Sequence, residues 1–108
     1  MQPLICKSFA KLNLCLHILD RRKDGYHNLE SIFCIIDFYD RLSFQKNNST
    51  KINFKTNSNE IDSTYNLVTK AYDLISSLYD IEGIDIFLDK KIPIGSGLGG
   101  GSSNAAVT

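Results

Sequence analysis

The sequence carries no surplus of charge of either sign and no long apolar run. Twelve Lys and Arg residues balance twelve Asp and Glu residues, so the formal net charge is zero. The chain therefore lacks the basic excess by which nucleic-acid-binding domains neutralise phosphates. No apolar run approaches the about 20 residues of a membrane-spanning helix, and the N-terminus has no signal-peptide pattern. These absences predict a cytoplasmic protein that binds neither nucleic acid nor membrane.

Cysteine is scarce, and its pattern argues against two common uses of the residue. The chain has three cysteines, Cys6, Cys15 and Cys34, each in strand-like apolar surroundings. An odd number does not suit a disulfide framework, and no Cys/His spacing is typical of a zinc site. We expect buried, reduced thiols.

Glycine is concentrated in one place. Five of the seven glycines lie between Gly95 and Gly101, within the segment 93–103, which reads PIGSGLGGGSS. Glycine's freedom in φ lets such a loop turn its backbone N–H groups towards a phosphate, and a following helix N-terminus adds to the site. The hydroxyls of Ser102 and Ser103 could bind phosphate or cap a helix that begins near Asn104. A flexible linker would be longer, more repetitive and flanked by polar residues, so a phosphate-binding loop is favoured.

Two familiar phosphate loops do not fit this segment. The P-loop needs a lysine directly after a glycine, and none stands there. Gly95, Gly97 and Gly100 satisfy G-x-G-x-x-G, but in the dinucleotide fold the first glycine follows the strand almost directly. Here residues 90–94 intervene, and no acidic residue follows to bind the ribose.

The order of the predicted strands and helices along the chain predicts an α+β fold with a mostly antiparallel or mixed sheet. A helix is predicted after an N-cap at Ser63 or Thr64, and a second helix is predicted after the glycine loop. Arg41–Phe44 and Lys51–Lys55 are predicted to form a hairpin. Phe33 is expected to fill the core. The expected strands are 4–9, 12–19, 26–36, 41–44, 51–55 and 84–88, and the expected first helix is 67–78.

The loop closely resembles the ATP-binding loop of the GHMP kinases, such as galactokinase, homoserine kinase and mevalonate kinase. Together with Ala10–Leu14 (AKLNL) and Asp24–Leu29 (DGYHNL), it resembles the branch that phosphorylates the 2-hydroxyl of 4-diphosphocytidyl-2-C-methyl-D-erythritol in the non-mevalonate isoprenoid pathway. The similarity spans essentially all 108 residues. It implies a GHMP-kinase N-terminal domain with the fold of ribosomal protein S5 domain 2. Residues 1–108 would be that ATP-binding domain, incomplete within its last helix and without the C-terminal domain.

The resemblance also implies roles for individual side chains. Lys11 matches the active-site lysine, whose cation could stabilise a forming alkoxide, although periodicity alone also allows a surface lysine on an edge strand. Asn13 could hydrogen-bond the substrate or simply lie on the sheet surface. Tyr26 and His27 match the residues that hold the substrate's cytosine, which suits a stacking ring beside hydrogen-bonding nitrogens.

ATP would be bound by the glycine loop and by residues near it. Lys90 could attract phosphate or be a solvated lysine at a strand end. Ser96 leaves the loop intact only if its φ is negative. Mg²⁺ is expected with the nucleotide, but its ligands cannot be identified in this chain. The implied ATP contacts are Pro93, Gly95, Ser96, Gly97, Leu98, Gly99, Gly100, Gly101, Ser102, Ser103, Lys90, Asn66 and Leu67.

Two alternative functions remain. One is another GHMP kinase, of the mevalonate or homoserine type, which the Asp24–His27 cluster disfavours because those substrates carry no cytosine. The other is a non-catalytic S5-like module that binds nucleotide or RNA, which the zero net charge disfavours. The resemblance places the general-base aspartate beyond residue 108. We therefore expect these residues alone to be catalytically inactive.

Overall fold

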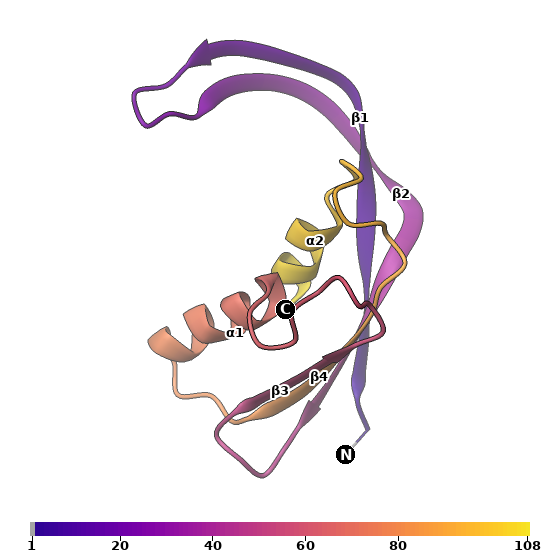
Figure 1. Cartoon of the computed structure of the whole chain (residues 1–108), viewed down its shortest axis with the longest axis vertical. Coiled ribbons are helices and arrows are strands. Elements are labelled where there is room, and N and C mark those ends of the chain that lie inside the picture. Colours follow the sequence, from indigo (N-terminus) through magenta and orange to yellow (C-terminus); the bar gives the residue numbers. More distant parts are fainter. Residues whose placement is uncertain (1) are drawn as a thin grey trace.

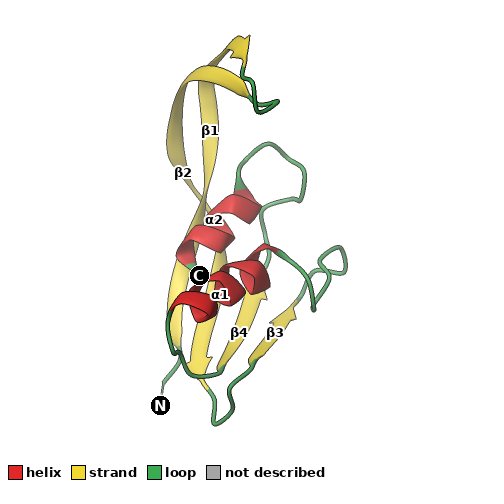
Figure 2. Cartoon of the chain, turned by 90° about the vertical axis from the view of Figure 1, so that its left-hand side faces the viewer, coloured by secondary structure: helices red, strands yellow, loops and turns green. Residues whose placement is uncertain are grey.

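The computed structural model describes residues 2–108 as a four-stranded mixed sheet with two helices on one face (Figures 1 and 2). The strand order across the sheet is β1-β2-β4-β3. The α+β class predicted from the sequence is confirmed. The elements are β1 (Leu4–Arg21), β2 (His27–Lys46), β3 (Ile52–Thr56), α1 (Leu67–Leu78), β4 (Ile84–Asp89) and α2 (Gly100–Val107).

Strands β1 and β2 form one long antiparallel hairpin, where the sequence pattern predicted four shorter strands. The predicted break at Ala10 is instead a register shift between Phe9 and Lys11, inside a continuous strand. Further shifts follow along the hairpin, and such bulges bend a strand pair. In Figure 1 the distal half of the hairpin accordingly curves towards the side that carries the helices.

The predicted hairpin between residues 41–44 and 51–55 is wrong, because β4 lies between β2 and β3. Strand β4 pairs antiparallel with β2 and parallel with β3. The loop after β2 wraps around the start of β4: Gly83 N donates to Ser49 O at 2.9 Å. A Cβ on Gly83 would lie 2.5 Å from that same oxygen, so this close approach requires glycine. Helix α1 then makes the crossover between the parallel strands.

Helix α1 covers the sheet and is capped at a position other than the one predicted. Its N-cap is Asn66, whose side chain accepts from Val68 N and Thr69 N in a capping box. The expected caps, Ser63 and Thr64, lie in a turn in which Asp62 Oδ1 accepts from Thr64 N at 2.7 Å. The core beneath the helix consists of Leu42, Phe54, Val68, Ile86 and Leu88.

The distal half of the hairpin packs against nothing among residues 2–108 that would bury its apolar side chains. Phe33 is 59% exposed, so the prediction that it fills the core is wrong. The three cysteines are free, and the prediction that they are buried is wrong: Cys34 is exposed, and Cys6 and Cys15 are half-buried. For Cys15 and Cys34 the reason is that the distal half of the hairpin packs against no other layer among residues 2–108. Within residues 2–108, no helix is long and apolar enough to cross a membrane.

Candidate functional site

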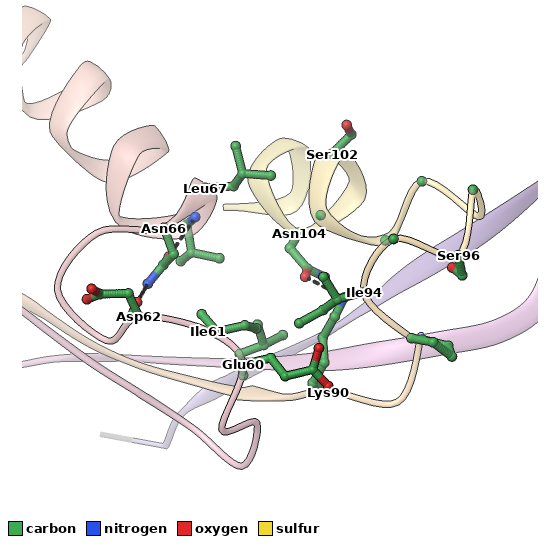
Figure 3. Close-up of a pocket in the computed structure, with 18 of the residues that line it drawn as sticks. Glu60, Ile61, Asp62, Asn66, Leu67, Lys90, Ile94, Ser96, Ser102 and Asn104 are labelled. Atoms are coloured by element: carbon green, nitrogen blue, oxygen red, sulfur yellow. Dashed lines mark hydrogen bonds between the residues drawn. The ribbon is translucent and has the colours of Figure 1, made fainter.

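A cavity of about 590 Å³ lies between the glycine loop and the start of α1 (Figure 3). Helix α2 follows the loop directly, and the segment from Glu60 to Asp62 forms another wall. Two chain segments that are distant in the sequence, residues 60–68 and 88–104, thus converge on one cavity. Its size suits a small-molecule ligand.

The N-terminus of α2 opens onto this cavity without a side-chain cap. The N-cap is Gly99, in the left-handed conformation at φ 70°, and no side chain accepts from the first turn. Of the two roles considered for Ser102 and Ser103, phosphate binding or capping, the structure excludes capping, because the helix begins at Gly100 and already contains both serines. The first N–H groups of a helix have no intrahelical acceptor, and the helix dipole makes this end positive. This end of α2 is therefore built to accept an anion.

The loop has the backbone conformation that its glycines permit. Gly95, Gly97 and Gly99 all have φ near +70° to +77°. No non-glycine residue among 2–108 has a positive φ, so Ser96 meets the condition set for it. Glycine is thus required where the loop turns, and serine is tolerated between two turns.

The start of α1 also lines the cavity, but unlike the start of α2 it is capped by a side chain. The side-chain oxygen of Asn66 is occupied by the capping bonds, and its Nδ2 donates to Asp62 O at 2.7 Å. Leu67 faces the cavity and approaches α2 closely, since a Cβ on Gly101 would lie 2.8 Å from Leu67 Cδ1. Asn66 therefore shapes the cavity wall, and Leu67 offers it an apolar surface.

Most of the residues predicted to contact ATP line this one cavity. Leu98 and Ser103 do not: Leu98 O accepts from Lys11 N at 2.9 Å, and Ser103 Oγ accepts from Ser8 Oγ at 2.9 Å. These two residues tie the loop to β1 instead. The predicted residues that line the cavity are Asn66, Leu67, Lys90, Pro93, Gly95, Ser96, Gly97, Gly99, Gly100, Gly101 and Ser102.

Lys11 lies against the glycine loop, although it is not part of the cavity lining. Besides the bond from its backbone, its Nζ donates a long hydrogen bond of 3.4 Å to Gly97 O. A Cβ on Gly99 would lie 3.1 Å from Lys11 Cε. None of the ion pairs among residues 2–108 involves Lys11. Its ammonium is thus beside the loop and not neutralised by a described carboxylate.

The other predicted substrate residues lie farther along the hairpin. Asn13 pairs across the strands with Phe33, and its Oδ1 accepts from Ser31 Oγ at 3.1 Å. Tyr26 is 74% exposed in the turn at the tip, and His27 begins β2. Lys11, beside the glycine loop, and these residues towards the hairpin tip thus follow one another along the same hairpin.

Sequence reasoning missed a buried polar cluster behind the loop. Asp40 is 0% exposed and lies 2.6 Å from Lys90 Nζ, which also donates to Asn104 Oδ1 at 3.1 Å. Burial raises the pKa of Asp40, but the hydrogen bonds from Lys90, two backbone amides and Asn104 outweigh it and hold the pKa below its ordinary value. Lys90 is only 7% exposed along its side chain, so it is not a solvated strand-end lysine.

The sequence did contain a signal for this cluster. Asp40 precedes the core residue Leu42 by two positions on the same strand, and alternation places both on the inward face. An inward aspartate requires a partner. That the partner is Lys90 follows only from the pairing of β2 with β4. No group of three or more His, Cys, Asp or Glu residues that could hold a metal ion occurs among residues 2–108.

Comparison with protein families finds a match over the part of the chain that forms this site. Residues 66–108 match the GHMP kinases N terminal domain. This segment begins at the N-cap of α1 and contains the whole glycine loop and α2.

Similar curated proteins share one name. The chain is 50% identical over 104 residues to the 4-diphosphocytidyl-2-C-methyl-D-erythritol kinase of Francisella philomiragia, covering 94% of the chain and 38% of that protein. It is 44% identical to the kinase of the same name from Burkholderia thailandensis, covering 95% of the chain and 36% of that protein. The chain thus spans less than two fifths of the length of these relatives.

Solved structures resemble the chain over nearly all of its length. A crystal structure of 4-(cytidine 5'-diphospho)-2C-methyl-D-erythritol kinase matches with a TM-score of 0.81 and 36% identity, over 96% of this chain and 37% of that one. The homoserine kinase of Cytophaga hutchinsonii matches with a TM-score of 0.67 at 17% identity, over 97% of this chain and 32% of that one. The second match concerns the fold alone.

Proposed function

We propose that this chain is the ATP-binding part of a 4-diphosphocytidyl-2-C-methyl-D-erythritol kinase. The premise is that nearly the whole chain is similar to proteins of that name, and that residues 66–108 match the GHMP kinases N terminal domain. The reaction would move the γ-phosphoryl group of ATP to the 2-hydroxyl of the acceptor, releasing ADP and the proton of that hydroxyl. Catalysis of this kind depends on positioning and on neutralising charge more than on covalent chemistry.

The uncapped N-terminus of α2, opening into the cavity beside the glycine loop, is the observation that carries the proposal. Its free N–H groups and positive dipole end would bind the phosphates of ATP. The apolar wall formed by Ile61, Leu67 and Ile94 would accept the adenine. Mg²⁺ would bind mainly through phosphate oxygens and water.

Lys11 would act on the transferred group. Its ammonium lies next to the loop where the phosphates would bind, and no described carboxylate pairs with it. A cation in that place favours the charge that develops on the phosphoryl and acceptor oxygens in the transition state.

Tyr26 and His27 would hold the cytosine of the acceptor at the hairpin tip. The exposed tyrosine ring offers a face for stacking, and the imidazole offers hydrogen-bonding nitrogens. Asn13, between the tip and Lys11, would contact the linking part of the acceptor. A cytoplasmic location remains part of the proposal and is supported by the three free cysteines.

A hybrid enzyme tests the function. This chain would replace the matching segment of the Francisella philomiragia kinase, and ATP-dependent phosphorylation would be assayed with 4-diphosphocytidyl-2-C-methyl-D-erythritol, mevalonate and homoserine. We expect turnover with the first acceptor only. Turnover with one of the others instead would overturn the assignment of the acceptor.

Lys11→Ala in the same hybrid tests the role of the lysine. We expect kcat to fall by about 100- to 1000-fold, with a much smaller change in ATP affinity, because the charge acts mainly in the transition state. Lys7→Ala is the matched control, since Lys7 lies on the same strand with its Nζ over the ring of Tyr39. A Lys11→Ala variant that keeps more than half of the wild-type turnover would remove Lys11 from the mechanism.

A further inference from the structure

The carboxylate of Asp40 holds both ends of the glycine loop. On the side where the loop begins, Oδ1 accepts from Lys91 N at 2.6 Å and from Ile92 N at 2.8 Å. On the side where the loop ends, Oδ2 accepts from Asn104 Nδ2 at 3.0 Å, and Asn104 belongs to α2. One side chain of β2 thus joins segments that the loop separates.

Lys90 reinforces the same connection. Its Nζ donates to Asp40 Oδ2 at 2.6 Å and to Asn104 Oδ1 at 3.1 Å. A Cβ on Gly100 would lie 2.9 Å from this Nζ, so the ammonium packs directly beneath the first residue of α2. The positive charge of Lys90 is therefore already paired with Asp40.

The cluster extends to β1 through a serine. Asn104 Nδ2 donates to Ser8 Oγ at 2.8 Å, and Ser8 Oγ donates to Ser103 Oγ at 2.9 Å. Ser8 and Asn104 are buried, and no buried side-chain nitrogen or oxygen among residues 2–108 lacks a partner. A fully satisfied polar network of this kind fixes geometry, because each hydrogen bond is directional.

Stability alone does not account for such a cluster. The desolvation of a buried ion pair roughly cancels its Coulomb attraction, so apolar side chains of similar size would stabilise the fold about as well. What the carboxylate adds is a defined distance between the start of the loop and α2. That distance decides whether the loop amides and the first N–H groups of α2 point at the same phosphate.

We propose that Asp40 is a positioning residue of the nucleotide site, which holds the glycine loop and the N-terminus of α2 in their phosphate-binding arrangement. The inference rests on the proposed function. Asp40 does not line the cavity and acts through Lys90, the backbone of Lys91 and Ile92, and Asn104. Its effect should therefore concern the phosphates and not the base.

Calorimetric titration of the 108-residue chain with Mg-ATP and, separately, with adenosine tests the proposal. Asp40→Asn keeps the size of the side chain but leaves Lys90 without a counter-ion. We expect at least tenfold weaker ATP binding and less than a twofold change for adenosine. Amide hydrogen exchange should increase in residues 91–104 and stay unchanged in α1 and β3, which a general loss of stability would not produce.

Asp37→Asn is the matched control, because Asp37 lies on the same strand and is exposed. If Asp40→Asn does not fold by circular dichroism, Asn104→Ala replaces it. This change removes the bond from Asp40 to α2, together with the bonds of Asn104 to Lys90 and Ser8, but keeps the Asp40–Lys90 ion pair, and it should weaken ATP binding several-fold. Equal ATP affinity in a folded variant, or equal losses for ATP and adenosine, would overturn the positioning role. Absence of ATP binding by the wild-type chain would instead refute the nucleotide site itself, and the inference with it.

Discussion

Gly99 meets two requirements that no other residue type meets at once: a positive φ and room for the side chain of Lys11. Its φ of 70° lies in the left-handed region, and a Cβ there would contact the side chain of Lys11 at 3.1 and 3.2 Å. The same residue is the N-cap of α2 and has no side chain that could compete for the free N–H groups. At this one position, backbone conformation, the approach of Lys11 and the open helix end all depend on the absence of a side chain.

Gly99→Val should weaken ATP binding of the chain at least tenfold without unfolding it. A β-branched residue is strained at positive φ, by more than the about 1–2 kcal/mol that left-handed backbone costs an ordinary residue, and its side chain would displace Lys11. Calorimetric titration with Mg-ATP measures the effect, and circular dichroism checks the fold.

Gly25→Val is the control for backbone strain. Gly25 has φ 90°, and a Cβ there would meet nothing within 4 Å, so the strain is similar but lies far along the chain from the glycine loop. Its ATP affinity should equal that of the wild type. A folded Gly99→Val chain with normal ATP affinity would refute a phosphate-binding loop.

The β1–β2 hairpin is the element that connects the two proposed ligand regions. About midway along it, Lys11 N donates to Leu98 O, and at its tip Tyr26 and His27 follow the turn that Asp24 and Gly25 form. The register shifts along it bend the strands towards the helical side of the sheet (Figure 1). This bend brings the distal half of the β1–β2 hairpin towards the side of the sheet that carries the glycine loop and the helices (Figure 1).

The double variant Tyr26→Ala, His27→Ala in the hybrid enzyme should raise KM for the cytidine-containing acceptor about tenfold or more. Loss of one stacked base is worth about 1–3 kcal/mol, and a lost hydrogen bond adds to that. The KM for ATP should change less than twofold, because the glycine loop is not altered. Steady-state kinetics with each substrate varied in turn measures both.

Leu29→Ala provides the comparison on the same hairpin. Leu29 is an exposed apolar residue two positions after His27 and carries no hydrogen-bonding group. Its variant should leave both KM values near those of the hybrid. Unchanged acceptor KM in the double variant, or an equal rise for ATP, would show that the cytosine is bound elsewhere.

At the scale of the whole molecule, the chain contains the proposed nucleotide site and Lys11, but no described carboxylate forms an ion pair with Lys11. The ion pairs among residues 2–108 are Arg22–Asp24, Lys46–Glu82 and Lys90–Asp40, and none of them involves Lys11. Asp40 is buried behind the loop and fully hydrogen-bonded, so it is unsuited to take a proton from an acceptor hydroxyl. The relatives are more than twice as long as this chain.

The 108-residue chain alone should therefore bind ATP and transfer no phosphoryl group to 4-diphosphocytidyl-2-C-methyl-D-erythritol. Phosphorus NMR of a mixture with Mg-ATP would follow ADP and the phosphorylated product over several hours. The hybrid enzyme, in the same assay, is the positive control. Product formed by the chain alone would mean that a carboxylate among these residues is the general base.

Local sequence patterns predicted the parts of the fold that depend on neighbouring residues. The period of α1, the strand 84–88 and the glycine loop are all where the pattern placed them, because periodicity and glycine content act over a few residues. The predicted N-cap of α1 was wrong, because several neighbouring polar residues can cap a helix and the sequence alone does not rank them. The N-cap is Asn66 and not Ser63 or Thr64, because the residues before Asn66 form a turn in which Asp62 Oδ1 accepts from Thr64 N and Tyr65 N.

By itself the sequence determined the chemistry available to this protein: a glycine-rich loop before a helix, a lysine in a strand, and a Tyr-His pair after a turn. Only the tertiary structure decided how these parts meet. It inserted β4 between β2 and β3, brought Lys11 of β1 onto Gly97 and Leu98, and buried Asp40 against Lys90 and Asn104. The reason is that strand order, register and the partner of a buried charge are set by contacts between residues far apart in the chain, such as Ile52 with Ile84, Asp40 with Lys90 and Ser8 with Ser103, which no local pattern encodes.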